Sequence, residues 1–133
     1  MSFMTRQRSV APDAIAPDGS EVRLLATASR GSMAQFTLPP GAVSKAVAHR
    51  TVEEVWLVIS GHGRMWRKLG SDEETVDLTP GTSISIPVGT HFQFRNDGNT
   101  PLECAGTTMP PWPGMDEAYE VEAPKRRTMK GES

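Results

Sequence analysis

Two segments in which glycine and proline bracket short apolar runs constrain the fold more than any other feature of the chain. The first is 41–61 (GAVSKAVAHRTVEEVWLVISG) and the second is 81–96 (GTSISIPVGTHFQFRN). β-Branched, aromatic and aliphatic residues concentrate between these turn signals, which is typical of short β-strands. The run 54–60 is apolar on both of its faces, so we expect it to be buried on both, in the middle of a closed sheet structure.

The β pattern continues on both sides of these segments, from about residue 20 to residue 110. Short runs with alternating polar and apolar side chains are separated by turn signals such as Pro39-Pro40-Gly41 and Asp97-Gly98-Asn99. A chain of 133 residues is long enough for one domain and too short for two ordinary ones. We therefore predict a single all-β domain over 20–110.

The two ends of the chain have a different composition. Residues 1–19 are polar and lack sustained periodicity, so they are expected to form an arm that orders only against a partner. In 111–133, closely spaced prolines exclude a regular element at first, and a basic, polar tail follows. We expect the stiff proline-rich segment to lay Trp112 over an apolar patch or over the mouth of the domain.

Charge and cysteine content exclude several classes of protein. The net charge of −2 provides no basic footprint for nucleic acid, and no apolar run approaches the length that spans a membrane. Cys104 has no second cysteine with which to form an intrachain disulfide. A cytoplasmic protein without nucleic-acid or membrane partners is expected.

His49 and Glu54 are the candidate functional pair. Glu54 shares a strand face with Trp56 and Val58, and a carboxylate on a buried face must be hydrogen-bonded, paired or bound to a metal. His49 lies on the preceding strand-like run, so a bend between the two runs would let both side chains face the same space. The pair is then either a structural hydrogen-bonded contact or a general acid and base.

The spacing of both segments resembles the two motifs of the cupin family. In the first, Gly41, His49, Glu54 and Gly61 stand at motif positions, but Val47 replaces the first of two histidines. In the second, the turn and end positions are filled by Gly81, Pro87, Gly89 and Asn96, whereas Phe92 replaces the histidine. The resemblance covers about residues 20–110 and implies a cupin β-barrel, or jelly roll, of two antiparallel sheets.

The same resemblance bears on metal binding. In metal-binding cupins three histidines and the glutamate hold the ion, and neither Val47 nor Phe92 can donate a lone pair. The resemblance therefore implies a metal-poor pocket without a cofactor, and a divalent transition metal remains the alternative. A shift of one residue in strand register after Gly89 would turn His91 and Gln93 inward and create a different site with His49 and Glu54.

Three functions are compatible with these residues. The first is binding of a small organic or carboxylate-bearing molecule; the second is catalysis by His49 and Glu54, in an acid–base isomerase or epimerase or in a metal-dependent, oxygenase-like enzyme; the third is a structural dimer with a vestigial cavity. The apolar outer face of 54–60 and the N-terminal arm favour a homodimer in each case. Around His49 and Glu54, the predicted ligand-binding residues are Lys45, Val47, Trp56, Trp66, Ser83, Ser85, Phe92 and Phe94.

Overall fold

The computed structural model describes residues 3–124. Within this range the chain forms eleven strands and one short 3-10 helix, η1 (Met115–Glu117). The strands are β1 (Ala14–Ile15), β2 (Glu21–Thr27), β3 (Ser32–Leu38), β4 (Val47–His49), β5 (Glu53–Ser60), β6 (Gly63–Leu69), β7 (Asp72–Leu78), β8 (Ser83–Ile86), β9 (His91–Asn96), β10 (Leu102–Met109) and β11 (Ala118–Glu120).

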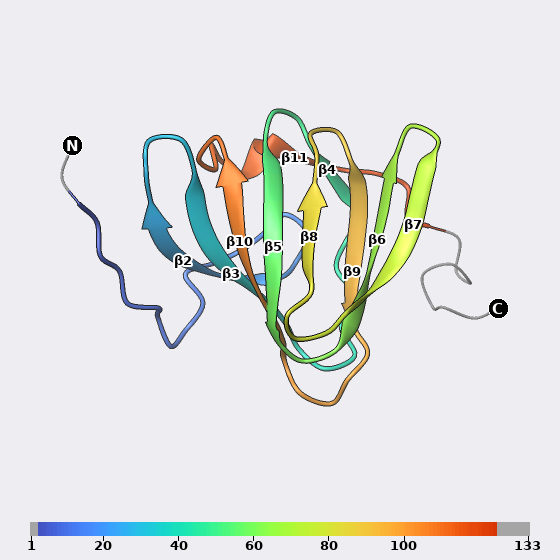
Figure 1. Cartoon of the computed structure of the whole chain (residues 1–133), viewed down its shortest axis with the longest axis horizontal. Helices are drawn as coiled ribbons and strands as arrows, with labels where there is room; N and C mark the ends of the chain where they lie inside the picture. Colours follow the sequence, from blue (N-terminus) through green and yellow to red (C-terminus); the bar gives the residue numbers. More distant parts are fainter. Residues whose placement is uncertain (1–2, 125–133) are drawn as a thin grey trace.

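The strands form two sheets. One has the order β1-β2-β3-β10-β5-β8 and the other the order β11-β4-β9-β6-β7. All paired neighbours are antiparallel. Figure 1 shows β2, β3, β10, β5 and β8 in this order across the front of the molecule, with β9, β6 and β7 beyond them. The prediction of an all-β jelly roll of two antiparallel sheets is confirmed.

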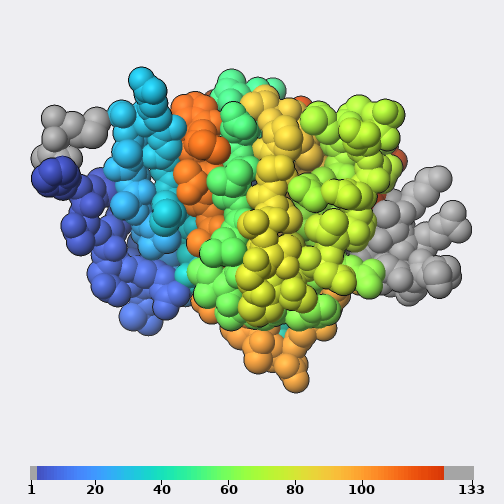
Figure 2. Space-filling model, in the orientation of Figure 1, coloured from blue at the N-terminus to red at the C-terminus, as the bar shows by residue number. Residues whose placement is uncertain are grey.

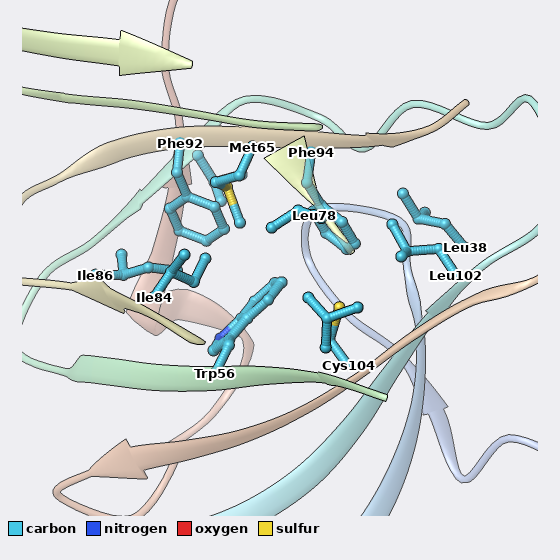
Figure 3. Close-up of a cluster of buried hydrophobic side chains, with 12 residues drawn as sticks. Leu38, Trp56, Met65, Leu78, Ile84, Ile86, Phe92, Phe94, Leu102 and Cys104 are labelled. Atoms are coloured by element: carbon cyan, nitrogen blue, oxygen red, sulfur yellow. The ribbon is translucent and has the colours of Figure 1, made fainter. Parts of the chain in front are cut away.

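The core lies between the two sheets and is centred on aromatic side chains. Trp56 of β5 meets Phe94 of β9 edge-on, with ring centroids 5.0 Å apart, and Phe36 of β3 stacks on Trp56 at 4.8 Å. Figure 3 shows Phe92 and Phe94 pointing from one sheet toward Trp56 on the other, with aliphatic side chains filling the space between them. The inner faces of both sheets therefore bury a continuous apolar layer.

β5 shows where the predicted burial was wrong. Its inward residues Trp56 and Val58 are buried, whereas the outward residues Val55, Leu57 and Ile59 are each 47–48% exposed. These three side chains lie on the outer face of the six-stranded sheet, where Figure 2 shows β5 at the surface between β10 and β8. The second sheet covers only the opposite face, so one side of β5 lacks cover from the described residues.

The end positions of the two motifs fix turns. Gly61 has φ 91°, and a Cβ there would lie 2.6 Å from the carbonyl oxygen of Pro101. Only glycine accepts this combination of left-handed backbone and close approach. Asn96 donates from Nδ2 to the carbonyls of Leu38 and Thr100 and accepts from the Gly98 amide at Oδ1. Both residues therefore hold the loop regions at one end of the sandwich.

Both ends of the described chain add a strand to a sheet. β1 pairs with β2, and the segment before it is held by Arg23, whose guanidinium donates to the carbonyls of Ser9 and Val10. β11 pairs with β4. The predicted C-terminal tail from residue 125 onward lies outside the described residues. In the described part of the chain, no helix is long and apolar enough to cross a membrane.

Candidate functional site

A cavity of about 150 Å³ lies between the two sheets. Strands of both sheets line it, together with the loop before β2 and the segment after β10. Its aromatic walls are Phe36, Trp56, Phe92 and Trp112, and its ionisable groups are Asp18, His49 and Glu54. The cavity is therefore largely apolar, with a few polar side chains, as is usual for small-molecule sites.

His49 and Glu54 face each other in this cavity, as the sequence predicted. His49 ends β4, Glu54 lies on β5, and the two residues are 5% and 3% exposed. Nδ1 of His49 lies 2.9 Å from Oε2 of Glu54, which is ion-pair distance. The ring N–H is not aligned for a hydrogen bond, and Nδ1 has no other partner among the described residues. The contact is therefore electrostatic, without the directionality of a good hydrogen bond.

The second carboxylate oxygen of Glu54, Oε1, accepts a hydrogen bond. Trp56, two residues further along the same face of β5, donates its indole Nε1–H to Oε1 of Glu54 at 2.9 Å. One oxygen therefore faces an imidazole and the other accepts an indole proton. These contacts explain how a carboxylate is accommodated between two apolar sheet faces, where an unpaired one would be strongly disfavoured.

Aromatic rings hold the imidazole of His49 on two further sides. Phe92 and Trp112 each approach it edge-on, with ring centroids at 5.2 and 5.1 Å. Trp112 belongs to the proline-rich segment after β10, so it packs over the cavity as expected from the sequence. Through these contacts the orientation of His49 depends on residues from β9 and from the C-terminal segment.

Asp18 brings a third ionisable group to the cavity. It lies in the loop between β1 and β2, is 7% exposed, and accepts hydrogen bonds at Oδ1 from the amide and the hydroxyl of Ser20. Burial raises the pKa of the Asp18 carboxyl, and the negative charge of Glu54 adds to this rise. The two hydrogen bonds from Ser20 and the proximity of His49 act in the opposite direction without cancelling it.

Glu117 of η1 fixes the bend between His49 and Glu54. Its Oε2 accepts from the amides of Thr51 and Val52 at 2.6 and 2.8 Å, and its Oε1 accepts from the Thr51 hydroxyl at 2.7 Å. Burial alone would raise the pKa of Glu117, but these hydrogen bonds outweigh it and hold the pKa below its usual value. A C-terminal side chain thus positions the turn on which the candidate pair depends.

Val47 and Phe92, which stand where the sequence resemblance leads us to expect histidines, both face the cavity. They are 3% and 1% exposed, and they are paired directly across β4 and β9. Because Phe92 and Phe94 face inward, the alternative register that would turn His91 and Gln93 inward is wrong. In the part of the chain that the structure describes, no group of three or more His, Cys, Asp or Glu side chains could hold a metal ion.

The structure brings three of the eight predicted ligand-binding residues to the cavity, Val47, Trp56 and Phe92. Phe94 packs behind Trp56 in the core and does not line the cavity. Four further residues lie away from it: Lys45, Trp66, Ser83 and Ser85.

Lys45 precedes β4 and is exposed, whereas the errors for Trp66, Ser83 and Ser85 have one physical origin, the choice of strand face. In β8 the apolar Ile84 and Ile86 turn inward, which leaves Ser83 and Ser85 in solvent. In β6 Met65 takes the inner face, while Trp66 packs against Ala46 on the opposite side and donates to Glu73. An apolar interior selects the more apolar of two alternating sets.

Sequence reasoning missed Asp18 and Glu117 because both lie outside the motif region. Asp18 precedes Gly19 in a turn signal, and an aspartate at such a place is ordinarily explained by the turn alone. Glu117 is one of several acidic residues in a polar stretch, and nothing in that stretch marks it as buried.

Comparison with known proteins defines the class. Residues 34–107, more than half of the chain, match the family model described as "Cupin domain". The chain belongs to the cupin family. It is 30% identical over 107 residues to the uncharacterized protein MJ1618 of Methanocaldococcus jannaschii, covering 77% of this chain and 82% of that protein.

Longer proteins contain a similar unit. The xanthan biosynthesis protein XanB of Xanthomonas campestris is 30% identical over 99 residues, which is 74% of this chain and 20% of XanB. Oxalate decarboxylase of Bacillus subtilis has a TM-score of 0.69 at 20% identity, with 82% of this chain and 29% of that chain covered. The capsular polysaccharide assembling protein CapF of Staphylococcus aureus has a TM-score of 0.67 at 20% identity, with 88% of this chain and 34% of that chain covered. At these identities the structural likeness concerns the fold alone.

Replacing Glu117 by Gln should destabilise the protein at neutral pH by about 2–3 kcal/mol, because hydrogen bonds to a carboxylate are lost. A carboxyl whose pKa is lowered by folding stabilises the fold above its unfolded pKa, and this contribution disappears as the pH falls through the folded pKa. The difference between wild type and Glu117→Gln should therefore narrow in acid. Denaturant unfolding across the acidic and neutral range measures it.

Glu120→Gln is the matched control for this measurement, because Glu120 lies three residues away and is exposed. It should leave the free energy of unfolding within about 0.5 kcal/mol of wild type. A Glu117→Gln variant as stable as the control at neutral pH would contradict the role given to Glu117.

Proposed function

We propose that the chain binds a small organic molecule in the cavity between its sheets, through aromatic walls and a few polar groups. The observation that carries this proposal is the pair Val47 and Phe92, whose hydrocarbon side chains line the cavity where the cupin motifs place histidines. Apolar surface at these two positions favours burial of a carbon skeleton over coordination of an ion.

The size of the cavity bounds the ligand. An engineered protein cavity of about 150 Å³ is known to take benzene, and the present cavity has a volume of about 150 Å³. A ligand with roughly six to ten non-hydrogen atoms would match this space. Ring stacking and edge contacts with Trp56, Phe92 and Trp112 would supply most of the buried area.

A transition metal does not fit the residues present. The structure of B. subtilis oxalate decarboxylase is described with Mn(II) centres, and that description belongs to that protein. Here only His49 and Glu54 stand at the motif positions for ligands, and both oxygens of Glu54 are in contact with His49 or Trp56. Divalent transition ions are ordinarily held by three or more protein ligands, so we derive no chemistry through a metal.

Acid–base catalysis is the second candidate function, and one observation favours it. His49 turns Nδ1 toward Glu54, so a carboxylate orients the ring while Nε2 makes no hydrogen bond to any described residue. An imidazole held in this way can transfer a proton to or from a bound molecule, as an isomerase or epimerase requires. The poor alignment of the Nδ1 contact makes this arrangement a weaker basis than the cavity itself.

Ligand binding can be followed through Trp56 and Trp112, since both line the cavity. Purified protein, treated with a chelator, should bind at least one member of a panel of neutral and charged ring compounds of this size, saturably and with a change in tryptophan fluorescence. Ala34→Leu, which fills the cavity, should abolish binding. Ala105→Leu, on the outward face of β10, should not.

The outcomes of this titration separate the candidate functions. Binding that disappears on chelation, or the absence of saturable binding by any compound, would overturn the proposal. Turnover of a bound compound that is lost in Glu54→Gln while its affinity is kept would establish the second function instead.

We propose that a second copy of the chain covers the outer face of β5. Three large apolar side chains there, Val55, Leu57 and Ile59, are about half exposed in a row on one strand. Such a stripe is typical of a surface that packs against another protein. Figure 2 shows it on an open face of the molecule, flanked by β8 and β10.

Leu57→Lys should convert a dimer into a monomer in sedimentation at micromolar concentration, because a charge would be buried at the interface. Leu69→Lys is the control, since Leu69 is also 43% exposed but lies on the other sheet. A monomeric wild-type protein, or a dimer that survives Leu57→Lys, would contradict this arrangement.

A further inference from the structure

The ionisable groups that line the cavity are two carboxyls and one imidazole. Asp18, Glu54 and His49 are all at most 7% exposed. No lysine or arginine lines the cavity among residues 3–124. Lys45, which the sequence placed here and which could have paired with a carboxylate ligand, is exposed instead. An anionic ligand would therefore lack a permanent positive partner on the described walls.

Acidic groups outnumber basic ones on the described walls of the cavity. Two carboxyls and one imidazole line it, and no permanently charged cation balances them. This composition favours a cation over an anion of the same size.

The aromatic walls favour the same kind of ligand. Trp56, Phe92 and Trp112 line the space beside these carboxyls. The faces of such rings carry negative potential and attract ammonium groups, most strongly where water is excluded. Aromatic cages combined with a carboxylate are a general solution for the recognition of organic ammonium ions.

We propose that the ligand is a small organic cation, which consists of a carbon ring or branched skeleton with one ammonium group, and that Asp18 is its counter-ion. This inference rests on the proposed small-molecule function. In this arrangement the carbon skeleton packs against Val47, Phe92 and Trp56, and the ammonium lies beside Asp18.

Asp18 suits this role better than Glu54 does. Both oxygens of Glu54 have protein contacts, whereas both hydrogen bonds to the Asp18 carboxylate end on Oδ1. Oδ2 of Asp18 is therefore left to accept from a ligand. The raised pKa of Asp18, caused by burial and by Glu54, is consistent with a carboxyl that lacks a cationic partner in the free protein.

Matched compounds test this inference directly. Benzylammonium, benzyl alcohol and benzoate have similar size and differ in charge. Tryptophan fluorescence should show benzylammonium binding at least about tenfold more tightly than benzyl alcohol, and benzoate more weakly than either. Because the pKa of Asp18 is raised and its carboxyl must lose its proton to pair with the ammonium, affinity should rise with pH while the ligand stays charged. His49 and Glu54 are the other ionisable groups that face Asp18.

Asp18→Asn separates charge from structure, because the amide oxygen can still accept from Ser20. The variant should lose about tenfold in affinity for benzylammonium, keep its affinity for benzyl alcohol, and show a weaker pH dependence. Asp13→Asn is the control, since Asp13 also caps a backbone amide, that of Leu24, but is exposed and outside the cavity. It should bind all three compounds as wild type does.

The possible binding results separate this inference from the proposed small-molecule function. If none of the three compounds binds the wild-type protein, this inference falls together with the small-molecule function. If benzyl alcohol or benzoate binds at least as tightly as benzylammonium, the inference alone is overturned and the cavity remains a binding site. If Asp18→Asn does not fold, the pH dependence of the wild type still decides, since an affinity that is constant or falls with pH excludes Asp18 as the counter-ion.

Discussion

The burial of Glu54 is the constraint on which the arrangement of the site depends. An ionised carboxylate between two apolar sheet faces is tolerated only when its oxygens have partners. Trp56 supplies one from the same strand and His49 the other from the opposite sheet, so the two sheets are linked across the cavity by polar contacts as well as by packing. The indole of Trp56 is therefore both a wall of the cavity and a hydrogen-bond donor that orients its central charge.

Both ends of the chain complete this site, although the motifs lie in its middle. The segment before β2 brings Asp18 to the cavity, and the segment after β10 brings Trp112 over His49. Glu117 then ties the C-terminal segment to the bend at Thr51. In this chain, segments outside the barrel strands therefore contribute both charge and aromatic surface to the cavity.

The sequence was sufficient for the fold and for the central pair, because turn residues and strand parity are local properties. Gly61 and Asn96 meet backbone requirements that few other residues can meet, and parity puts Glu54 on the same strand face as Trp56 and Val58. Parity alone cannot decide which alternating set faces the interior, and this is why Ser83 and Ser85 were misplaced. The interior of the sandwich is apolar, so Ile84 and Ile86 face it and the two serines face solvent. The sequence could not predict that Asp18 lines the cavity, because only the folded chain brings the loop between β1 and β2 to it.

The central claim is that hydrocarbon at positions 47 and 92 makes this a cavity for an organic molecule rather than for a metal. Elemental analysis of wild type and of the double variant Val47→His, Phe92→His, after equilibration with Mn²⁺ and removal of free metal, tests it most directly. The two side chains are neighbours across β4 and β9 and both face the cavity, so the histidines would join His49 and Glu54 in one donor set. We expect no stoichiometric metal in wild type and about one ion per chain in the double variant. A wild-type protein that holds a stoichiometric transition metal and loses it in Glu54→Ala would contradict the account.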